Sequence, residues 1–215
     1  MIFNEAIAHG WLKQPANALT NVFYVLNTLF IVIFSFQDQR RKLALIFIVI
    51  SFLVGLTSFL YHASNAFFFQ FFDLASMYLL SGLLFSLVLV RLDGVKPRQW
   101  LIIFLLVFGG SAGLLFLIRG KSGALIFGME CLLILWLEWR VWRKSGGIPS
   151  YRYFVSALIL LAASFVFWVL DYNRLLFIPD NHFIQGHGIW HILNSFCFIL
   201  LYLFYRQFNQ HEIGI

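Results

Sequence analysis

Charged residues are scarce in this chain of 215 residues. Asp, Glu, Lys and Arg together make up 11% of it, whereas 61% is hydrophobic. A soluble domain of this size needs more polar surface than that to stay in solution. The composition therefore argues against a soluble globular protein. The mean hydropathy of +0.87 is typical of a protein that lies in a lipid bilayer.

Cysteine is also rare, and both residues, Cys131 and Cys197, fall inside apolar runs. This placement argues against a structural disulfide and indicates no particular redox compartment. The first apolar run is too long for the core of a secretory signal, so we expect no cleavable signal peptide. The sequence also lacks an internal repeat and a pair of helices broken by Gly or Pro, which gives a transporter little support.

What the chain has in abundance is long apolar runs. A helix that crosses the hydrocarbon core needs about 20 apolar residues. Seven runs reach that length within the usual uncertainty of their ends. They cover residues 18–36, 43–63, 70–90, 100–118, 124–142, 153–170 and 187–205. The sequence thus predicts an all-α membrane protein, a seven-transmembrane helix bundle that forms a single domain over residues 1–215.

The formal net charge of +6 lies in the short connections between these runs and on no single face. We therefore expect no nucleic-acid partner. If the N-terminus is outside, the inner segments hold Arg40, Arg41, Lys42, Arg91, Lys96, Arg98, Arg140, Arg143, Lys144, Arg152 and Arg206. The outer segments hold only Lys13, Arg119, Lys121 and Arg174. Because positive residues concentrate inside, the N-terminus is predicted out and the C-terminus in.

Ionisable residues at membrane depth are costly and usually functional. Ser58 and His62 are four residues apart near the end of the second run, and Asp73 opens the third run. His187 and His191 are four apart at the start of the seventh, so each four-residue pair shares a helix face. In a seven-helix protein these three helix ends lie on the same side of the membrane. The five side chains can therefore meet in one shallow layer.

Three neutral imidazoles with a fourth position for water form the open arrangement of catalytic zinc. We therefore predict that His62, His187 and His191 bind zinc. Asp73 would be the general base, and Ser58 would donate a hydrogen bond to the developing oxyanion. The alternative is that each histidine is an ordinary interfacial residue at a helix end.

Three segments together resemble the alkaline ceramidases. They are residues 55–62 (GLTSFLYH), Asp73 eleven residues after His62, and residues 187–191 (HGIWH). Residues 11–21 (WLKQPANALTN) also look like the entry to the first helix in that family. The family belongs to a superfamily of seven-helix metal-dependent hydrolases that includes the adiponectin receptors. The resemblance implies hydrolysis of the amide of ceramide to a fatty acid and a sphingoid base.

One position departs from the family pattern. The resemblance implies a Ca2+ ion bound by acidic N-terminal residues beside the zinc, and any residual calcium site would fall on Glu5, Gln14 and Asn17. Gln14 stands where the family typically has Glu. A hard cation takes several carboxylate oxygens, and this segment offers Glu5 and little else, which argues against calcium.

Three further residues in the apolar runs are candidates for a role. Trp190 lies between the two histidines of the last run and is a candidate for lining the cavity. Glu130 would either line the cavity or form a structural hydrogen bond. For Glu138 the favoured interpretation is an interfacial neighbourhood with Arg140 and Arg143.

Other polar or small residues are given structural interpretations. Asp171 and Arg174 would pair at a helix end, and residues 109–113 (GGSAG) would form a close-packing helix surface. His9 and His182 are expected on the surface of loops.

Two functions compete. The first is a zinc-dependent amide hydrolase whose ceramide-like lipid substrate enters sideways between helices. The second is a membrane receptor or sensor in which the zinc is structural. In the hydrolase interpretation the protein lies in the plasma (inner) membrane, with its site toward the periplasmic or extracellular face.

Overall fold

The protein is described here from a computed structural model, which covers residues 3–36, 41–118, 123–147 and 149–215. Within these residues all regular structure is helical. The chain forms two compact units by its internal contacts. The first comprises Met1–Gln70 and Tyr151–Phe204, and the second Phe71–Ser150 and Tyr205–Ile215.

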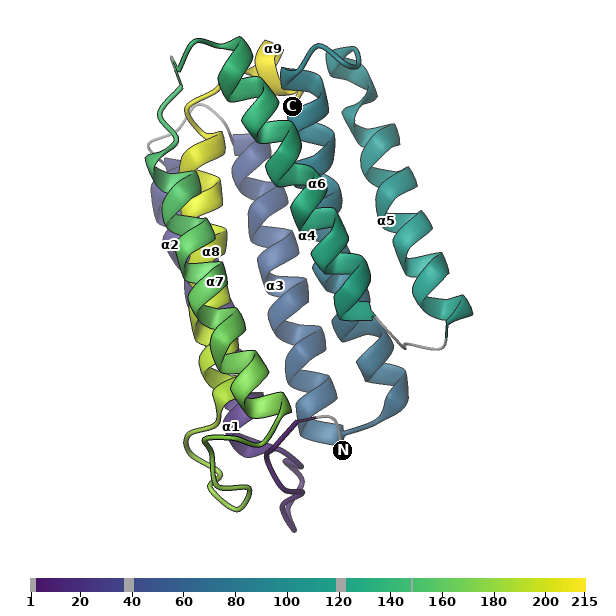
Figure 1. Cartoon of the computed structure of the whole chain (residues 1–215), viewed down its shortest axis with the longest axis vertical. Helices are drawn as coiled ribbons and strands as arrows, with labels where there is room; N and C mark the ends of the chain where they lie inside the picture. The colour runs from purple at the N-terminus through teal and green to yellow at the C-terminus, as the bar shows by residue number, and fades with distance from the viewer. Residues whose placement is uncertain (1–2, 37–40, 119–122, 148) are drawn as a thin grey trace. The chain divides into compact units, whose positions relative to one another are not determined.

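The helices follow the predicted apolar runs closely (Figure 1). The long ones are α2 (Val22–Phe36), α3 (Arg41–Ser64), α4 (Phe67–Arg91), α5 (Trp100–Leu117), α6 (Gly123–Lys144), α7 (Arg152–Tyr172) and α8 (Gly186–Tyr205). Short helices α1 (Pro15–Leu19), η1 (Pro97–Gln99) and α9 (Gln210–Ile213) complete the described elements. All seven predicted helices are confirmed, each to within a few residues.

Six stretches are long and apolar enough to cross a membrane, which supports an integral, multi-pass membrane protein. They are Pro15–Phe36, Arg41–Ser64, Phe67–Arg91, Pro97–Leu117, Arg152–Tyr172 and Gly186–Tyr205. Helix α6 is 22 residues long but is absent from this set, because it carries five charged residues: Glu130, Glu138, Arg140, Arg143 and Lys144. The orientation of the termini stays a prediction. Arg40, Arg119 and Lys121, which enter the charge count, lie outside the described residues.

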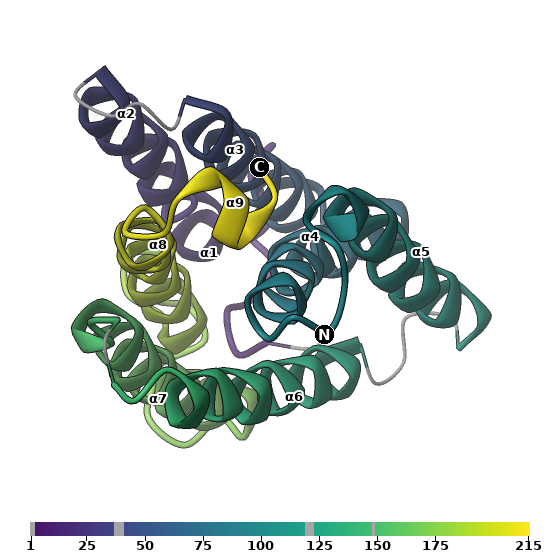
Figure 2. The same cartoon turned by 90° about the horizontal axis from the view of Figure 1, so that it is seen from above.

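The first unit is built around α8, which lies between α2 and α7 (Figure 2). Phe198 of α8 meets Tyr24 of α2 edge to face at 5.5 Å between ring centroids, and Tyr202 meets Phe47 of α3 at 5.8 Å. Phe204 packs on Phe154 of α7 at 5.1 Å. Helix α8 therefore contacts three neighbours through aromatic residues of its C-terminal half.

The second unit is built around α4, which lies between α5 and α6 (Figure 2). Tyr78 of α4 is fully buried and donates a hydrogen bond to the carbonyl of Gly123, at the start of α6. Further along, Val88 of α4 packs against Leu137 and Val141 of α6.

The glycines of α5 do not form the predicted close-packing surface. A Cβ added at Gly109, Gly110 or Gly113 would meet nothing within 4 Å among the described residues. That expectation was wrong. Instead, Gly82 of α4 faces the α5 side chain of Phe104 at 3.5 Å, so the small residue at this helix contact belongs to α4.

Candidate metal centre

Three histidines of the first unit meet at one point. His62 lies in the last turn of α3, and His187 and His191 in the first two turns of α8. Their exposed fractions are 0%, 4% and 4%. One nitrogen from each ring lies within 4.8 Å of the other two, and Nε2 of His62 is 3.1 Å from Nε2 of His187. Nitrogens that share a tetrahedral zinc are roughly 3.3 Å apart, so this cluster could hold one metal ion.

The N-terminal segment fixes the end of α3 that carries His62. The last carbonyls of a helix have no partner within the helix. Here the backbone N–H of Lys13 donates to the carbonyl of Ala63 at 2.9 Å, and that of Gln14 donates to the carbonyl of His62 at 3.0 Å. The chain then turns into α1, with Pro15 at its first position, where proline is favoured.

The carboxylate of Glu5 caps the start of α1. Its two oxygens accept the backbone N–H groups of Ala16 and Asn17, each at 2.9 Å. A carboxylate at a helix N-terminus satisfies free amide groups and interacts favourably with the helix dipole. Glu5 is fully buried, so these bonds compensate for the loss of its hydration. His182 also contributes, with Nδ1 3.1 Å from Glu5 Oε1; it lies in the α7–α8 loop, as predicted, and its side chain is 31% exposed.

Hydrogen bonds to the far ring nitrogens orient two of the histidines. Nδ1 of His62 lies 2.7 Å from Oε1 of Gln14, and Nδ1 of His191 lies 3.0 Å from the backbone carbonyl of Asn17. Both oxygens only accept, so the two Nδ1 atoms must donate. In the neutral rings Nε2 then carries the lone pair that a metal needs. The amide of Gln14 is itself oriented, because its Nε2 donates to the carbonyl of Glu5 at 3.1 Å.

His187 is held differently. The ring of Phe3 stacks on it at 3.5 Å between centroids, with an angle of 20° between the planes. Its Nδ1 is buried and has no hydrogen-bond partner among the described residues. The position of His187 therefore depends on aromatic stacking and on the start of α8.

The start of α8 is anchored by Asp171. The backbone amides of Gly186 and His187 face the carboxylate of this residue, and its Oδ2 accepts the N–H of Asn4 at 3.0 Å. Asp171 is fully buried. The predicted pairing with Arg174 is therefore replaced by a cap on α8, because free amides at a helix start attract a carboxylate.

Gly188 allows α8 to approach α1. A Cβ at this position would lie 3.2 Å from Cγ2 of Thr20 and 3.4 Å from the carbonyl of Ala16. Oγ1 of Thr20 also lies 3.2 Å from Nδ1 of His191. A larger side chain at position 188 would therefore press on the segment that orients His191.

The predicted Ser58 lies beside this cluster. It is one turn before His62 on α3, and its Oγ is 3.4 Å from Nε2 of His191. Its exposed fraction is 2%. A hydroxyl next to a ligand nitrogen can donate a hydrogen bond to an oxygen atom that approaches the metal.

A family model described as Ceramidase matches residues 14–213, which is nearly the whole chain. The chain belongs to the ceramidase family. It is also 23% identical over 190 residues to human alkaline ceramidase 1, an alignment that covers 85% of this chain and 71% of the relative. The resemblance inferred from the sequence is confirmed.

Family membership gives a context for the residues that sequence reasoning missed. Phe3, Thr20 and Asp171 contact or anchor the histidines, yet none of them was assigned a role at the site. Thr20 lies in the segment 11–21 that resembles the family, so a signal was present. Phe3 offered none, because a single Phe near the N-terminus among 27 in the chain carries no pattern.

The residues named for a residual calcium site all lie in this region of the first unit. Glu5 caps α1, and Gln14 binds His62. The side chain of Asn17 is fully buried, and neither its Oδ1 nor its Nδ2 has a hydrogen-bond partner among the described residues. The argument against calcium at these residues stays a prediction.

Trp190 and Glu130 take different positions. The ring of Trp190 contacts Phe165 and Trp168 of α7, at 6.2 and 6.4 Å between centroids. Glu130 belongs to the second unit, where it accepts hydrogen bonds from Ser81 of α4 at 2.5 Å and from Ser111 of α5. These contacts are the structural hydrogen bonds that were one of its two predicted roles.

Asp73 lies in the second turn of α4, within the second unit. Its role at the histidine site stays a prediction.

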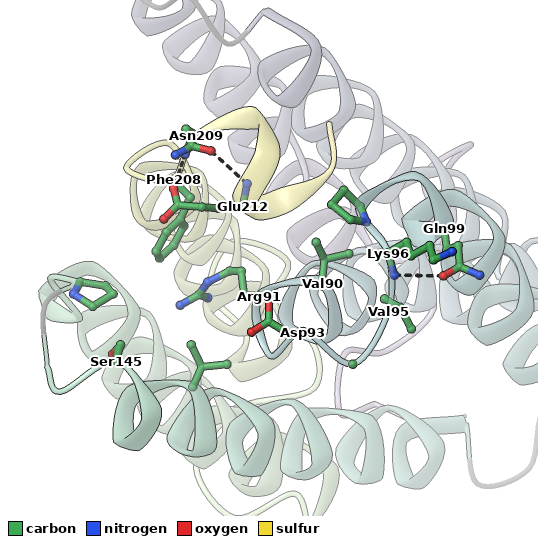
Figure 3. A pocket seen from close by; sticks show the side chains of 14 residues that line it. Val90, Arg91, Asp93, Val95, Lys96, Gln99, Ser145, Phe208, Asn209 and Glu212 are labelled. Carbon is green, nitrogen blue, oxygen red and sulfur yellow. Dashed lines mark hydrogen bonds between the residues drawn. The ribbon is translucent and has the colours of Figure 1, made fainter.

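A cavity in the second unit offers a contrast to the histidine cluster (Figure 3). It has a volume of about 770 Å³ and lies among the ends of α4 and α6, the 93–97 connection and the C-terminal segment. Arg91, Asp93, Lys96 and Glu212 contribute charges of both signs to its wall. None of the predicted site residues lines it, so it is not the site inferred from the sequence.

Proposed function

We propose that this protein is a zinc-dependent amide hydrolase. Its substrate would be ceramide or a ceramide-like N-acyl lipid, and its products a free fatty acid and an amine, the sphingoid base. The observation that carries the proposal is the convergence of His62, His187 and His191 in a chain of the ceramidase family. The similarity to human alkaline ceramidase 1 supports the same substrate class.

The donor set fits zinc. Three buried imidazoles without a carboxylate among them suit a borderline metal better than calcium or magnesium. Such a metal supplies a Lewis acid that polarises the amide carbonyl and makes water a stronger nucleophile near neutral pH. Gln14 and the Asn17 carbonyl would keep one Nε2 lone pair on His62 and one on His191 directed at the metal.

Ser58 and Asp73 are proposed to act on the substrate and the attacking water. Ser58 Oγ, 3.4 Å from Nε2 of His191, would donate a hydrogen bond to the oxyanion that forms when the amide is attacked. Asp73 would accept the proton of the water and deliver it to the leaving amine. The amine leaves neutral, because the proton lost by the water balances the one gained by the nitrogen.

The test measures fatty acid released from ceramide in phosphatidylcholine vesicles by the purified protein. We expect hydrolysis that a chelator abolishes and zinc restores. Asp73→Asn should keep its zinc and lose activity by about 10²–10⁴-fold, and Ser58→Ala should lose about 10²-fold. Asp180→Asn and Ser64→Ala, at exposed positions, are the matched controls and should stay near wild type. Stoichiometric zinc without any hydrolysis would instead favour the receptor or sensor.

The orientation is proposed from charge and helix parity. With seven spans the N-terminus, His62 and His187 share one face, and the positive residues put that face outside, at the periplasmic or extracellular side of a plasma membrane. The test uses a Phe183→Cys variant in a Cys131→Ser, Cys197→Ala background. Phe183 lies in the α7–α8 loop and is 90% exposed. The variant should react with an impermeant thiol reagent on intact cells, whereas Lys42→Cys should not. The opposite labelling pattern would place the site at the cytoplasmic face.

A further inference from the structure

One exposed face of α6 combines apolar and positively charged side chains. Six exposed residues recur at intervals of three or four, which places them on a single stripe of the helix. Leucine and methionine occupy one end, tryptophan the middle and arginine the other end. The residues are Leu125, Met129, Leu132, Trp136, Arg140 and Arg143. The stripe is therefore apolar along most of its length and doubly positive at one end.

Both arginines of this stripe lie over indole rings. The guanidinium carbon of Arg140 is 5.1 Å from the ring centroid of Trp136, and that of Arg143 is 5.4 Å from the ring centroid of Trp139. These cation–π contacts hold two planar forks one turn apart, with their N–H groups still available to an acceptor. Trp136 and Trp139 are 49% and 50% exposed, so the paired groups face outward.

No carboxylate neutralises these two charges among the described residues. The anion of the same helix turn, Glu138, has an exposed fraction of 1% and binds Arg91. The predicted neighbourhood of Glu138 with Arg140 and Arg143 was therefore wrong. Because Glu138 is turned away, Arg140 and Arg143 keep two positive charges on the outer face, which would attract an anion from outside the chain.

The length of the stripe matches one leaflet. From Leu132 to Arg143 the helix rises about 16 Å at 1.5 Å per residue. Half of a hydrocarbon core of about 30 Å is about 15 Å. An acyl chain beside Leu132 and Trp136 would therefore bring its headgroup level with the two arginines, where tryptophans favour the interface.

We propose that this face of α6 is a binding site for an anionic phospholipid. The phosphate would accept hydrogen bonds from Arg140 and Arg143, and an acyl chain would lie along Leu132 and Met129. A lipid of net negative charge complements the unpaired arginines, whereas a zwitterionic lipid does not. The apolar half of the stripe distinguishes this ligand from a soluble phosphate, which would leave it uncovered.

The experiment titrates the purified, full-length protein in detergent micelles with phosphatidylglycerol or phosphatidylcholine and counts bound lipid by native mass spectrometry. We expect wild type to retain phosphatidylglycerol at least about tenfold more tightly. The Arg140→Gln/Arg143→Gln variant should lose this preference. The Lys96→Gln/Arg98→Gln variant is the matched control: it removes the same charge from exposed positions outside the stripe and should change affinity less than about twofold.

Two further arms separate the alternatives. Arg140→Lys/Arg143→Lys keeps the charge but not the planar forks, and should weaken phosphatidylglycerol binding several-fold. Glycerol phosphate at millimolar concentration should not displace the lipid. Equal losses in the two Gln variants would reveal general surface attraction and overturn the proposal. Displacement by glycerol phosphate, or dimers in place of bound lipid, would overturn it as well.

Discussion

Two buried polar clusters in this protein differ in whether they contain paired charges. In the second unit, Nη1 of Arg91 binds both oxygens of Glu138 at 2.6 and 2.9 Å, and the hydroxyl of Tyr205 donates to the same carboxylate at 2.7 Å. Phe208 covers the guanidinium at 3.8 Å (Figure 3). Every charge of that cluster has an opposite partner within it.

The histidine cluster of the first unit consists of three imidazoles and includes no carboxylate among the described residues. Nε2 of His62 lies 3.1 Å from Nε2 of His187, and Nε2 of His191 lies 3.4 Å from the Ser58 hydroxyl. Gln14 and the Asn17 carbonyl accept from the Nδ1 atoms of His62 and His191, so each of these neutral rings keeps an Nε2 lone pair that a cation can bind. Burial alone therefore does not mark a functional site in a membrane helix. A set of converging ligand nitrogens without a counter-charge does.

The largest effect should follow from removing a ligand. His62→Ala should reduce the zinc content from about one per chain to a small fraction and lower ceramide hydrolysis by at least about 10³-fold. It should also lower the unfolding temperature, because a metal joins α3 to α8. Metal analysis, the vesicle assay and thermal unfolding measure these effects. His9→Ala, at an exposed histidine, is the control, and a normal zinc content in His62→Ala would contradict the assignment.

Breaking the matched cluster should affect stability and leave the metal in place. Arg91→Met leaves Glu138 buried without its partner, which should cost about 3–5 kcal/mol in the free energy of unfolding. The Arg91→Met/Glu138→Met variant should regain most of that loss. Denaturation in micelles measures both. Lys144→Met removes a cation from the exposed pair with Asp93 and should cost less than about 1 kcal/mol. If Arg91→Met lost its zinc, the Arg91–Glu138 cluster would also affect metal binding, and the two clusters would not be independent.

A smaller effect should come from the groups that orient the ligands. Gln14→Leu removes the acceptor of His62 Nδ1–H and should weaken zinc binding by about 10–100-fold, as second-shell substitutions do. Gln14→Glu keeps an acceptor and should bind zinc at least as tightly as wild type. Competition with a chelator of known affinity gives both values. If Leu and Glu at position 14 behave alike, the bond to His62 does not set the affinity.

Much of the fold could be predicted because a bilayer permits few backbone solutions. The seven apolar runs correspond to α2–α8, since a buried backbone in lipid must satisfy its hydrogen bonds within a helix. The spacing of His187 and His191 similarly implied a shared face. His62, His187 and His191 lie together as predicted, and all three are at helix ends in the first unit.

Other features depend on which helix faces which, and periodicity does not encode that. The pairing of Glu138 with Arg91 joins residues 47 positions apart, so the nearby arginines of α6 were the wrong choice. The glycines of α5 looked like a packing surface, but their neighbours are absent among the described residues. The caps formed by Glu5 and Asp171 also depend on irregular segments, whose paths no simple pattern predicts.

The order of the chain sets the order in which the histidine cluster can form. Phe3, Gln14 and Asn17 precede His187 and His191 in the sequence, and the bond between Asn17 and His191 joins residues 174 positions apart. A nascent chain that has inserted only α2 and α3 holds one of the three histidines. Metal capture would therefore follow the insertion of α8, and a chain that stopped before this helix would lack the proposed centre.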